Sequence, residues 1–257
     1  MLYDVLREYR RYLETKYSRE TARTYSIRLC TILKGQNMTD IENRLDLEKI
    51  LANLSTIRHK NYFSQAKNAF LHYCEFQNIT LPAGVADIIK ELENDTRKKY
   101  RNLQAVDYRQ VEKTINSLKN KKLRVCYQTI IATGLRVSEL ADITPGDCLF
   151  SEDTITFEFT AKGGDRERVM LDRGAYSELY RNIHELWTST PPDKKLFYSA
   201  IHLQTNAKRH GFTCHDLRRA YAKLEYKKSR SKTEVMKRLR HSSLKNTNIY
   251  LRSKVKI

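Results

Sequence analysis

Apolar residues recur at helical spacing along almost the whole chain, and a single segment alternates clearly in the manner of a β-strand. The 257 residues include only eight glycines and four prolines, two residue types that weaken helix interiors. The alternating segment is TITFEFT at 154–160, and RVMLD at 168–172 is interpreted as the strand that returns after a turn. The sequence therefore predicts a mainly α-helical fold with one small antiparallel β-hairpin or sheet.

Local signals place the helices. Ser18 has the residue type and position of an N-cap, and Gly134 ends a helical pattern. In a short helix with Pro82 in its first turn, Val85, Ile88 and Ile89 are expected to face inward. The predicted helices cover 2–13, about 18–34, 42–54, 57–77, a short stretch from Pro82, 107–119, 121–133, 174–188, 199–210, 215–228, 231–240, and a last helix that carries Tyr250.

The charge of the chain is strongly unbalanced. Lys and Arg number 48 against 30 Asp and Glu, which gives a net charge of +18. Such a surplus repels itself unless a polyanion is nearby. This composition favours a nucleic acid partner over a merely solvated basic surface, and a membrane surface ranks third.

Other compositional features bear on the cellular compartment. No run of about 18 apolar residues exists, and the N-terminal string MLYDVLREYRRYLE lacks the apolar core of a signal peptide. The five cysteines are scattered, with no CxxC pair, which favours a reducing interior over a disulfide framework. We therefore expect a cytoplasmic protein with no membrane partner.

The periodicity changes in the middle of the chain. Residues 1–93 predict a small all-helical domain, and 105–257 predict an α+β domain. Between them, the segment 94–104 is basic and almost without apolar periodicity, so it is interpreted as a linker; the alternative is a frayed helix end. Lys98 and Lys99 in this segment are candidate contacts to a nucleic acid backbone.

Three strings in the C-terminal part gather groups that hold and protonate phosphate. They are GLRVSEL at 134–140, HDLRRAYA at 215–222 and LRHSSLKNTNIY at 239–250. Arginine is always charged and binds phosphate in a bidentate manner, while a tyrosine can attack a phosphodiester. Each string alone has an ordinary explanation: a solvated arginine, a structural HxxR pair, or a histidine that caps a helix. The candidate catalytic residues are Arg136, Lys162, His215, Arg218, His241 and Tyr250.

In this order and spacing, the strings resemble the motif boxes of the tyrosine recombinase family, which includes the phage integrases and Xer-like resolvases. The resemblance covers about 130–250 at the level of motifs, including the nine-residue step from His241 to Tyr250. For 1–93 the resemblance is architectural only. It implies an N-terminal core-binding domain that binds DNA and a catalytic domain over 105–257.

The resemblance also implies roles in a reaction that needs neither metal nor ATP. Tyr250 would attack the scissile phosphate and form a 3′-phosphotyrosyl bond. Arg136 and Arg218 would clamp that phosphate, and Glu139 would orient Arg136. Lys162, at the start of the turn between the two strands, would protonate the leaving 5′ oxygen, with Arg166 and Arg168 as close rivals for this role.

His215 and His241 would assist with proton transfer and hydrogen bonding. His215 and Arg218 are three residues apart, so they share one face of a helix. Another stripe of that helix is apolar, so the polar pair is expected to point away from the core, towards a cleft. The residues of the apolar stripe are Leu217, Ala220, Tyr221 and Leu224.

Some positions depart from the pattern of the family. Arg219 stands where histidine is frequent, and Arg240 stands where glycine is frequent. Both are candidate DNA contacts, as is Arg168 in the returning strand. After Tyr250 only LRSKVKI remains, so any docking on a neighbouring subunit would be brief, as one short strand added to a neighbour's hairpin.

The sequence thus predicts a site-specific DNA recombinase associated with the nucleoid. Its expected partners are double-stranded DNA, three further copies in a homotetrameric synapse, and accessory or activating proteins. Helices at 20–33, 57–77 and 199–210 are expected to face DNA.

Two alternatives stay open. One is a non-catalytic DNA-binding accessory or regulatory protein, which a helix-turn-helix interpretation of GLRVSEL would suit. The other is a tyrosine enzyme that relaxes DNA or resolves telomeres. No cofactor is expected, because the chain has no P-loop, and His210, Cys214 and His215 lack a second pair at zinc-finger spacing.

Overall fold

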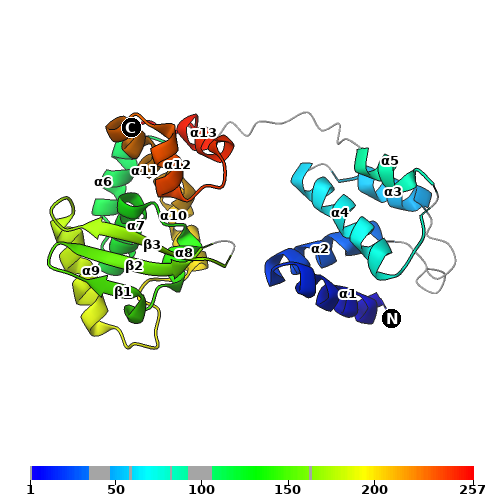
Figure 1. The fold of residues 1–257 in the computed structure, drawn as a ribbon, viewed down its shortest axis with the longest axis horizontal. Coiled ribbons are helices and arrows are strands. Elements are labelled where there is room, and N and C mark those ends of the chain that lie inside the picture. The colour runs from blue at the N-terminus through cyan, green and yellow to red at the C-terminus, as the bar shows by residue number, and fades with distance from the viewer. Residues whose placement is uncertain (1, 35–46, 58–59, 82, 92–105, 162–163) are drawn as a thin grey trace. The chain divides into compact units, whose positions relative to one another are not determined.

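The computed structural model describes residues 2–34, 47–57, 60–81, 83–91, 106–161 and 164–257. The chain divides into two compact units, an N-terminal unit of Met1–Arg101 and a C-terminal unit of Asn102–Ile257. Figure 1 shows the elements of each unit. The segment predicted as a linker, 94–104, lies outside the described residues, and so do Lys98, Lys99 and Lys162.

The described part of the N-terminal unit is built from helices (Figure 1). Helix α2 packs between α1 and α4, and the apolar stripes of these helices form the core. The buried Tyr9 hydroxyl donates a hydrogen bond of 2.7 Å to the Ala69 carbonyl, which ties α1 to α4. The helices are α1 (Leu2–Lys16), α2 (Arg19–Ile32), α3 (Leu47–Ser55), α4 (Lys60–Phe76) and α5 (Val85–Glu91).

Ser18 caps α2 as predicted, because its side chain accepts a hydrogen bond from the Thr21 backbone. The prediction for the short fifth helix was partly wrong. It begins at Val85, beyond Pro82, and Ile88 is 56% exposed whereas Ile89 is fully buried. Helix α5 has only seven residues and packs on α4, so one narrow stripe is enough to cover that contact.

In the C-terminal unit, helices pack against a small antiparallel sheet whose other face is exposed (Figure 1). Its elements are α6 (Tyr108–Asn116), α7 (Lys121–Thr133), α8 (Val137–Asp142), η1 (Pro145–Asp147), β1 (Cys148–Phe150), β2 (Thr154–Thr160), β3 (Arg166–Asp172), α9 (Ser177–Ser189), α10 (Ala200–Arg209), α11 (Cys214–Ser229), α12 (Lys232–Leu239) and α13 (Leu244–Leu251).

The sheet has the order β1-β2-β3 among the described residues. Strands β2 and β3 form the predicted hairpin, with Phe157 opposite Val169. Strand β1 was not predicted, because three residues are too short to display an alternating pattern. The mainly helical fold with a small antiparallel sheet is confirmed.

The C-terminal tail packs on its own unit. The Lys256 backbone bridges to Asp107, with Tyr108 donating to the Lys256 carbonyl over 2.9 Å. Val255 is buried against Tyr108 and Ala220. The tail therefore ties α13 to α6 and α11 within one chain.

A search of the described residues finds no helix with the length and apolar character of a membrane span.

Candidate active site

The turn after α7 positions Arg136. Helix α7 ends at Gly134, whose φ of 65° is left-handed, and an added Cβ there would overlap the ring of Tyr221. The chain then turns into α8, with Arg136 at its N-cap. Glu139 bonds twice to Arg136, accepting from its backbone N–H at 2.7 Å and from its guanidinium at 2.5 Å. Arg136 is thereby fixed at the start of a helix while its side chain stays 29% exposed.

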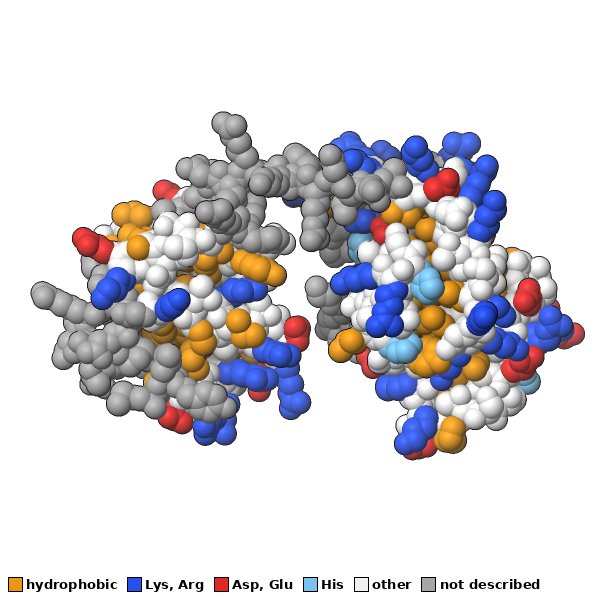
Figure 2. Space-filling model, turned by 180° about the vertical axis from the view of Figure 1, so that it is seen from behind, with side chains coloured by type: hydrophobic (Ala, Val, Ile, Leu, Met, Phe, Trp, Pro, Cys, Tyr) orange, Lys and Arg blue, Asp and Glu red, His pale blue; other side chains and the backbone are white. Residues whose placement is uncertain are grey.

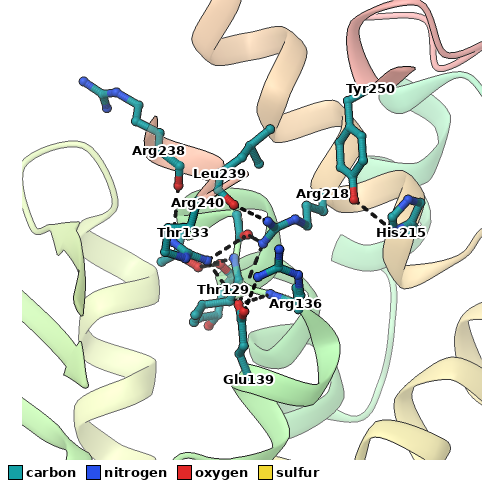
Figure 3. Close-up of polar contacts among 12 residues, drawn as sticks. Thr129, Thr133, Arg136, Glu139, His215, Arg218, Arg238, Leu239, Arg240 and Tyr250 are labelled. Atoms are coloured by element: carbon teal, nitrogen blue, oxygen red, sulfur yellow. Dashed lines mark hydrogen bonds and ion pairs between the residues drawn. The ribbon is translucent and has the colours of Figure 1, made fainter. Parts of the chain in front are cut away.

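Glu139 is the centre of an arginine cluster (Figure 3). Its carboxylate is 3% exposed, and it lies 3.1 Å from the Arg240 guanidinium and 3.8 Å from that of Arg218. Burial alone would raise the pKa of Glu139, but the hydrogen bonds from Arg136 and the charge of Arg240 hold this pKa below its usual value. One ionised carboxylate therefore faces three guanidinium groups.

Arg218 lies deeper than the sequence predicted. Its side chain lines a cavity together with His215, but only 1% of the residue is exposed. Its guanidinium donates to the carbonyls of Gly134 and Leu239 (Figure 3). The face of α11 turned away from the main core is covered by α12 and α13, which explains the burial.

Burial and the nearby charges of Arg136 and Arg240 lower the pKa of Arg218 to about 10, so it stays charged at neutral pH. Its Nε atom is buried and has no hydrogen-bond partner among the described residues. A buried guanidinium held by two carbonyls, with a donor to spare beside a cavity, suits an anionic ligand.

Tyr250 points towards the same cavity from α13 (Figure 3). Its hydroxyl lies 3.4 Å from Nδ1 of His215, and its ring centroid lies 4.8 Å and 4.7 Å from those of His215 and His241. On the other side, His241 Nδ1 shares a 3.0 Å hydrogen bond with the buried Thr247 hydroxyl. The two histidines therefore flank the tyrosine.

Both histidines are neutral at physiological pH. Burial of the ring beside the cavity, followed by the charges of Arg219 and Arg218, lowers the pKa of His215 to about 4, even though the residue as a whole is exposed. Burial, followed by the charges of Arg218 and Arg136, lowers the pKa of His241 to about 4 as well. A neutral imidazole has one donor and one acceptor nitrogen, so each ring can accept one hydrogen bond and donate another. The negative charge of a bound phosphate would raise the pKa of either ring and make it a better proton acceptor.

The cavity has a volume of about 330 Å³ and is bordered by α8, α10, α11 and α13. Four of the six candidate catalytic residues line it: Arg136, His215, Arg218 and Tyr250. His241 contacts the ring of Tyr250, and Lys162 is outside the described residues. Lys208, in the last turn of α10, also lines the cavity and was missed by the sequence analysis. A lysine at the end of a helix predicted to face DNA is the signal that would have identified it.

The other predicted contacts lie in different surroundings. Arg168 is exposed on β3 and pairs with Glu158 at 2.6 Å. Arg219 is partly buried and pairs with Asp216 at 3.1 Å. Arg240 turns its guanidinium inward, which differs from the exposed position that a DNA contact requires. Among the described residues, no group of His, Cys, Asp or Glu side chains is arranged to hold a metal ion.

The sequence model of the phage integrase family matches residues 101–256, and the chain belongs to this family. It is 28% identical over 155 residues to tyrosine recombinase XerH of Campylobacter jejuni, a match that covers 52% of this chain and 41% of the relative. The match thus spans less than half the length of that relative.

Solved structures share the fold. The chain resembles the XerH site-specific recombinase bound to palindromic difH substrate, with a TM-score of 0.66, 17% identity, and coverage of 89% of this chain and 75% of that one. It also resembles a lambda integrase tetramer bound to a Holliday junction, with a TM-score of 0.70, 16% identity, and coverage of 100% and 78%.

Proposed function

We propose that this chain is a site-specific DNA recombinase that cuts and rejoins DNA strands through a 3′-phosphotyrosyl intermediate. The observation that carries the proposal is the position of the Tyr250 hydroxyl, at the wall of a cavity that Arg136 and Arg218 also line. A nucleophile and two guanidinium groups around one space are what attack on a phosphodiester requires.

The arginine cluster would hold the scissile phosphate. Three arginines share the single carboxylate of Glu139, and three positive charges less one negative charge leave two positive charges unbalanced. A phosphodiester carries one negative charge and gains a second as the pentacovalent transition state forms. The excess charge therefore stabilises the transition state more than the bound substrate, which is the condition for catalysis.

His215 would accept the proton of Tyr250. A phenol has a pKa near 10, so its hydroxyl is a poor nucleophile until the proton leaves. Nδ1 of the neutral His215 lies 3.4 Å from that hydroxyl, and catalytic hydrogen bonds of this length shorten when substrate binds. His241, on the other side of the ring, would donate to a non-bridging phosphate oxygen.

Bond making and breaking balance without an external cofactor. The Tyr250 oxygen forms a bond to phosphorus while the bond from phosphorus to the 5′ oxygen breaks, and a proton passes to that oxygen. By family resemblance, we propose that Lys162 supplies this proton. The 5′-hydroxyl of a partner strand then reverses the attack. The phosphotyrosyl ester conserves the bond energy, so the reaction needs neither ATP nor metal.

Double-stranded DNA is the proposed substrate, and the nucleoid the proposed location. The net charge of +18 supports this substrate, and Figure 2 shows histidines among Lys and Arg side chains on one face of the C-terminal unit. We propose that residues 1–93 form a core-binding domain that binds DNA and that residues 105–257 form the catalytic domain. The linker 94–104 would follow the DNA backbone, with Lys98 and Lys99 contacting its phosphates.

Exchange of two strands at each of two sites requires four active tyrosines, so we propose a homotetramer assembled on DNA. Lambda integrase has been solved as a tetramer bound to a Holliday junction, and its fold is shared by this chain. Accessory or activating proteins that bind the same DNA would fit such an assembly.

The test is covalent trapping on nicked suicide DNA that carries a candidate site from the DNA flanking the gene. We expect the wild-type protein to form an adduct that survives denaturation, and Tyr250→Phe to form none. Tyr180→Phe is the matched control, because it removes a tyrosine hydroxyl on α9 that bonds to the Ser151 carbonyl and lies outside the cavity. This control should form the adduct at the wild-type level.

The other possible results of this experiment distinguish the alternative functions. A wild-type protein that binds the DNA specifically yet forms no adduct would be either a non-catalytic DNA-binding relative or an enzyme that requires an activating partner, and adding host extract distinguishes the two. If an adduct forms, incubation with two sites on one supercoiled circle decides the next step. Exchange products identify a recombinase, whereas relaxation or hairpin ends without exchange identify a relaxing or telomere-resolving enzyme.

A further inference from the structure

Arg240 occupies a backbone conformation that L-residues seldom adopt. It ends α12 with φ 54° and ψ 47°, in the left-handed region where glycine is favoured. Arg230 ends α11 in a similar conformation, with φ 54° and ψ 11°, and its side chain is exposed. Glycine would relieve the strain at either position, so the two residues form a matched pair that differs in where the side chain lies.

The Arg240 guanidinium is directed into the protein. Its side chain is 9% exposed and lies 3.1 Å from Glu139, 3.5 Å from the Gly134 carbonyl and 4.9 Å from the ring centroid of Phe159 (Figure 3 shows the Glu139 side). The ring stacks against the cation, and the two oxygens accept its N–H groups. These contacts fix the guanidinium on three sides.

The two oxygens that accept hydrogen bonds from Arg240 also hold Arg136 and Arg218, the two arginines that are proposed to bind the phosphate and are called the phosphate clamp below. The Glu139 carboxylate holds Arg136 through its backbone and guanidinium. The Gly134 carbonyl accepts from Arg218. Arg240 therefore touches one support of each clamping arginine, although it does not line the cavity itself.

Charge argues against a role as mere packing. Arg240 places a third cation beside Arg136 and Arg218, and like charges at close range repel. A residue that only filled this space would be apolar, because a buried cation is stabilised less than an apolar group of similar size. A buried third cation is useful where an anion must be bound.

We propose that Arg240 is a positioning residue that sets the orientation of Arg136 and Arg218 by binding Glu139 and the Gly134 carbonyl. The inference rests on the proposed function, since the clamp it serves is the phosphate clamp. It assigns Arg240 a role inside the protein in place of the predicted DNA contact.

The test compares Arg240→Gly with Arg230→Gly, which relieves the same kind of backbone strain away from the cavity. We expect Arg240→Gly to slow single-turnover adduct formation about 10- to 100-fold while DNA affinity stays within about twofold. Arg240→Lys, which keeps the charge, should recover part of the rate. Arg230→Gly should cleave at the wild-type rate. If Arg240→Gly does not fold, Arg240→Met takes its place, since it removes the charge and keeps the side-chain stem.

Two results would overturn the role of Arg240. One is wild-type cleavage by Arg240→Gly; the other is a parallel loss of DNA affinity and cleavage, which would identify a DNA contact. Absence of the adduct in the wild-type protein would instead overturn the proposed function. NMR relaxation of the arginine Nε–H groups tests the positioning role without cleavage: Arg136 should become more mobile in Arg240→Gly and not in Arg230→Gly, and equal mobility in both would refute it.

Discussion

The candidate active site has two sides that are held in very different ways. On the arginine side, Arg136, Arg218 and Arg240 are fixed by Glu139 and by backbone carbonyls. On the nucleophile side, Tyr250 has one hydrogen bond of 3.4 Å and two ring contacts, and it belongs to the eight-residue helix α13. Arg218 and Glu139 are buried, whereas Arg136 and Tyr250 are partly exposed.

The difference teaches how the two halves of the proposed reaction would be prepared. Charges aimed at a phosphate stabilise a transition state best when they need no rearrangement at the moment of reaction. A nucleophile must approach phosphorus in line, so it benefits from freedom to move once DNA is bound. The arginine side is organised before DNA arrives, and we expect the nucleophile side to complete its geometry on DNA.

The largest effect is expected from Glu139→Gln. This change leaves three guanidinium groups without a carboxylate, and breaking a buried ion pair costs about 3–5 kcal/mol. We expect the free energy of unfolding of the C-terminal unit to fall by that amount and cleavage to fall by 100-fold or more, on the order of a misplaced catalytic group. Urea denaturation and single-turnover cleavage measure the two effects.

Glu158→Gln is the matched control for that experiment. Glu158 pairs with the exposed Arg168 on the sheet, where removal of an ion pair changes stability by less than about 1 kcal/mol. Equal destabilisation by both substitutions would mean that the Glu139 carboxylate does not hold the arginine side. The proposed difference between the two sides of the site would then be wrong.

Local sequence signals predicted most of the fold. Helix α7 ends at Gly134 as expected, because a left-handed C-cap is a local property of the backbone. The β2–β3 hairpin followed from alternation over seven residues. Strand β1 was missed because three residues are too short to show alternation, although its partner β2 follows closely in the sequence. The burial of α5 depends on its packing against α4, so no local pattern predicted the exposed Ile88.

The motif strings gave the residues that the structure brings to one cavity, since spacing and residue type suffice for that. They did not predict how deeply Arg218 is buried, because that burial arises only when α12 and α13 pack against α11. Nor did they give the inward turn of Arg240, which follows from a left-handed backbone angle at one residue. Thr247 was missed because its contact with His241 exists only after α13 packs.

A smaller effect is expected from Thr247→Val on the nucleophile side. The substitution keeps the shape of the buried side chain and removes the hydroxyl that bonds to Nδ1 of His241. Loss of one hydrogen bond should lower the free energy of unfolding by about 1 kcal/mol. Because His241 would then be free to rotate, cleavage should fall roughly tenfold with unchanged DNA affinity.

Thr129→Val is the control, since the buried Thr129 hydroxyl bonds to the Val125 carbonyl within α7. It should cost similar stability without slowing cleavage. If the two variants slow cleavage equally, Thr247 contributes through stability alone, and the nucleophile side has no orienting contact of its own.

A further effect is a pH dependence of stability that reports on the burial of His241 and on the arginine charges beside it. The pKa of His241 is about 4 in the folded protein and near 6.5 in the unfolded chain, so the unfolded chain binds more protons between these values. The resulting contribution to stability is complete above about pH 6.5 and is lost as the pH falls towards 4. His241→Gln should therefore flatten the decline in the free energy of unfolding from pH 7 to pH 5. A bound DNA phosphate would oppose the arginine charges, raise the pKa of His241 and reduce the same slope.

An unchanged slope in His241→Gln would mean that the arginine side does not act on the histidines, and the two sides would then be electrostatically independent.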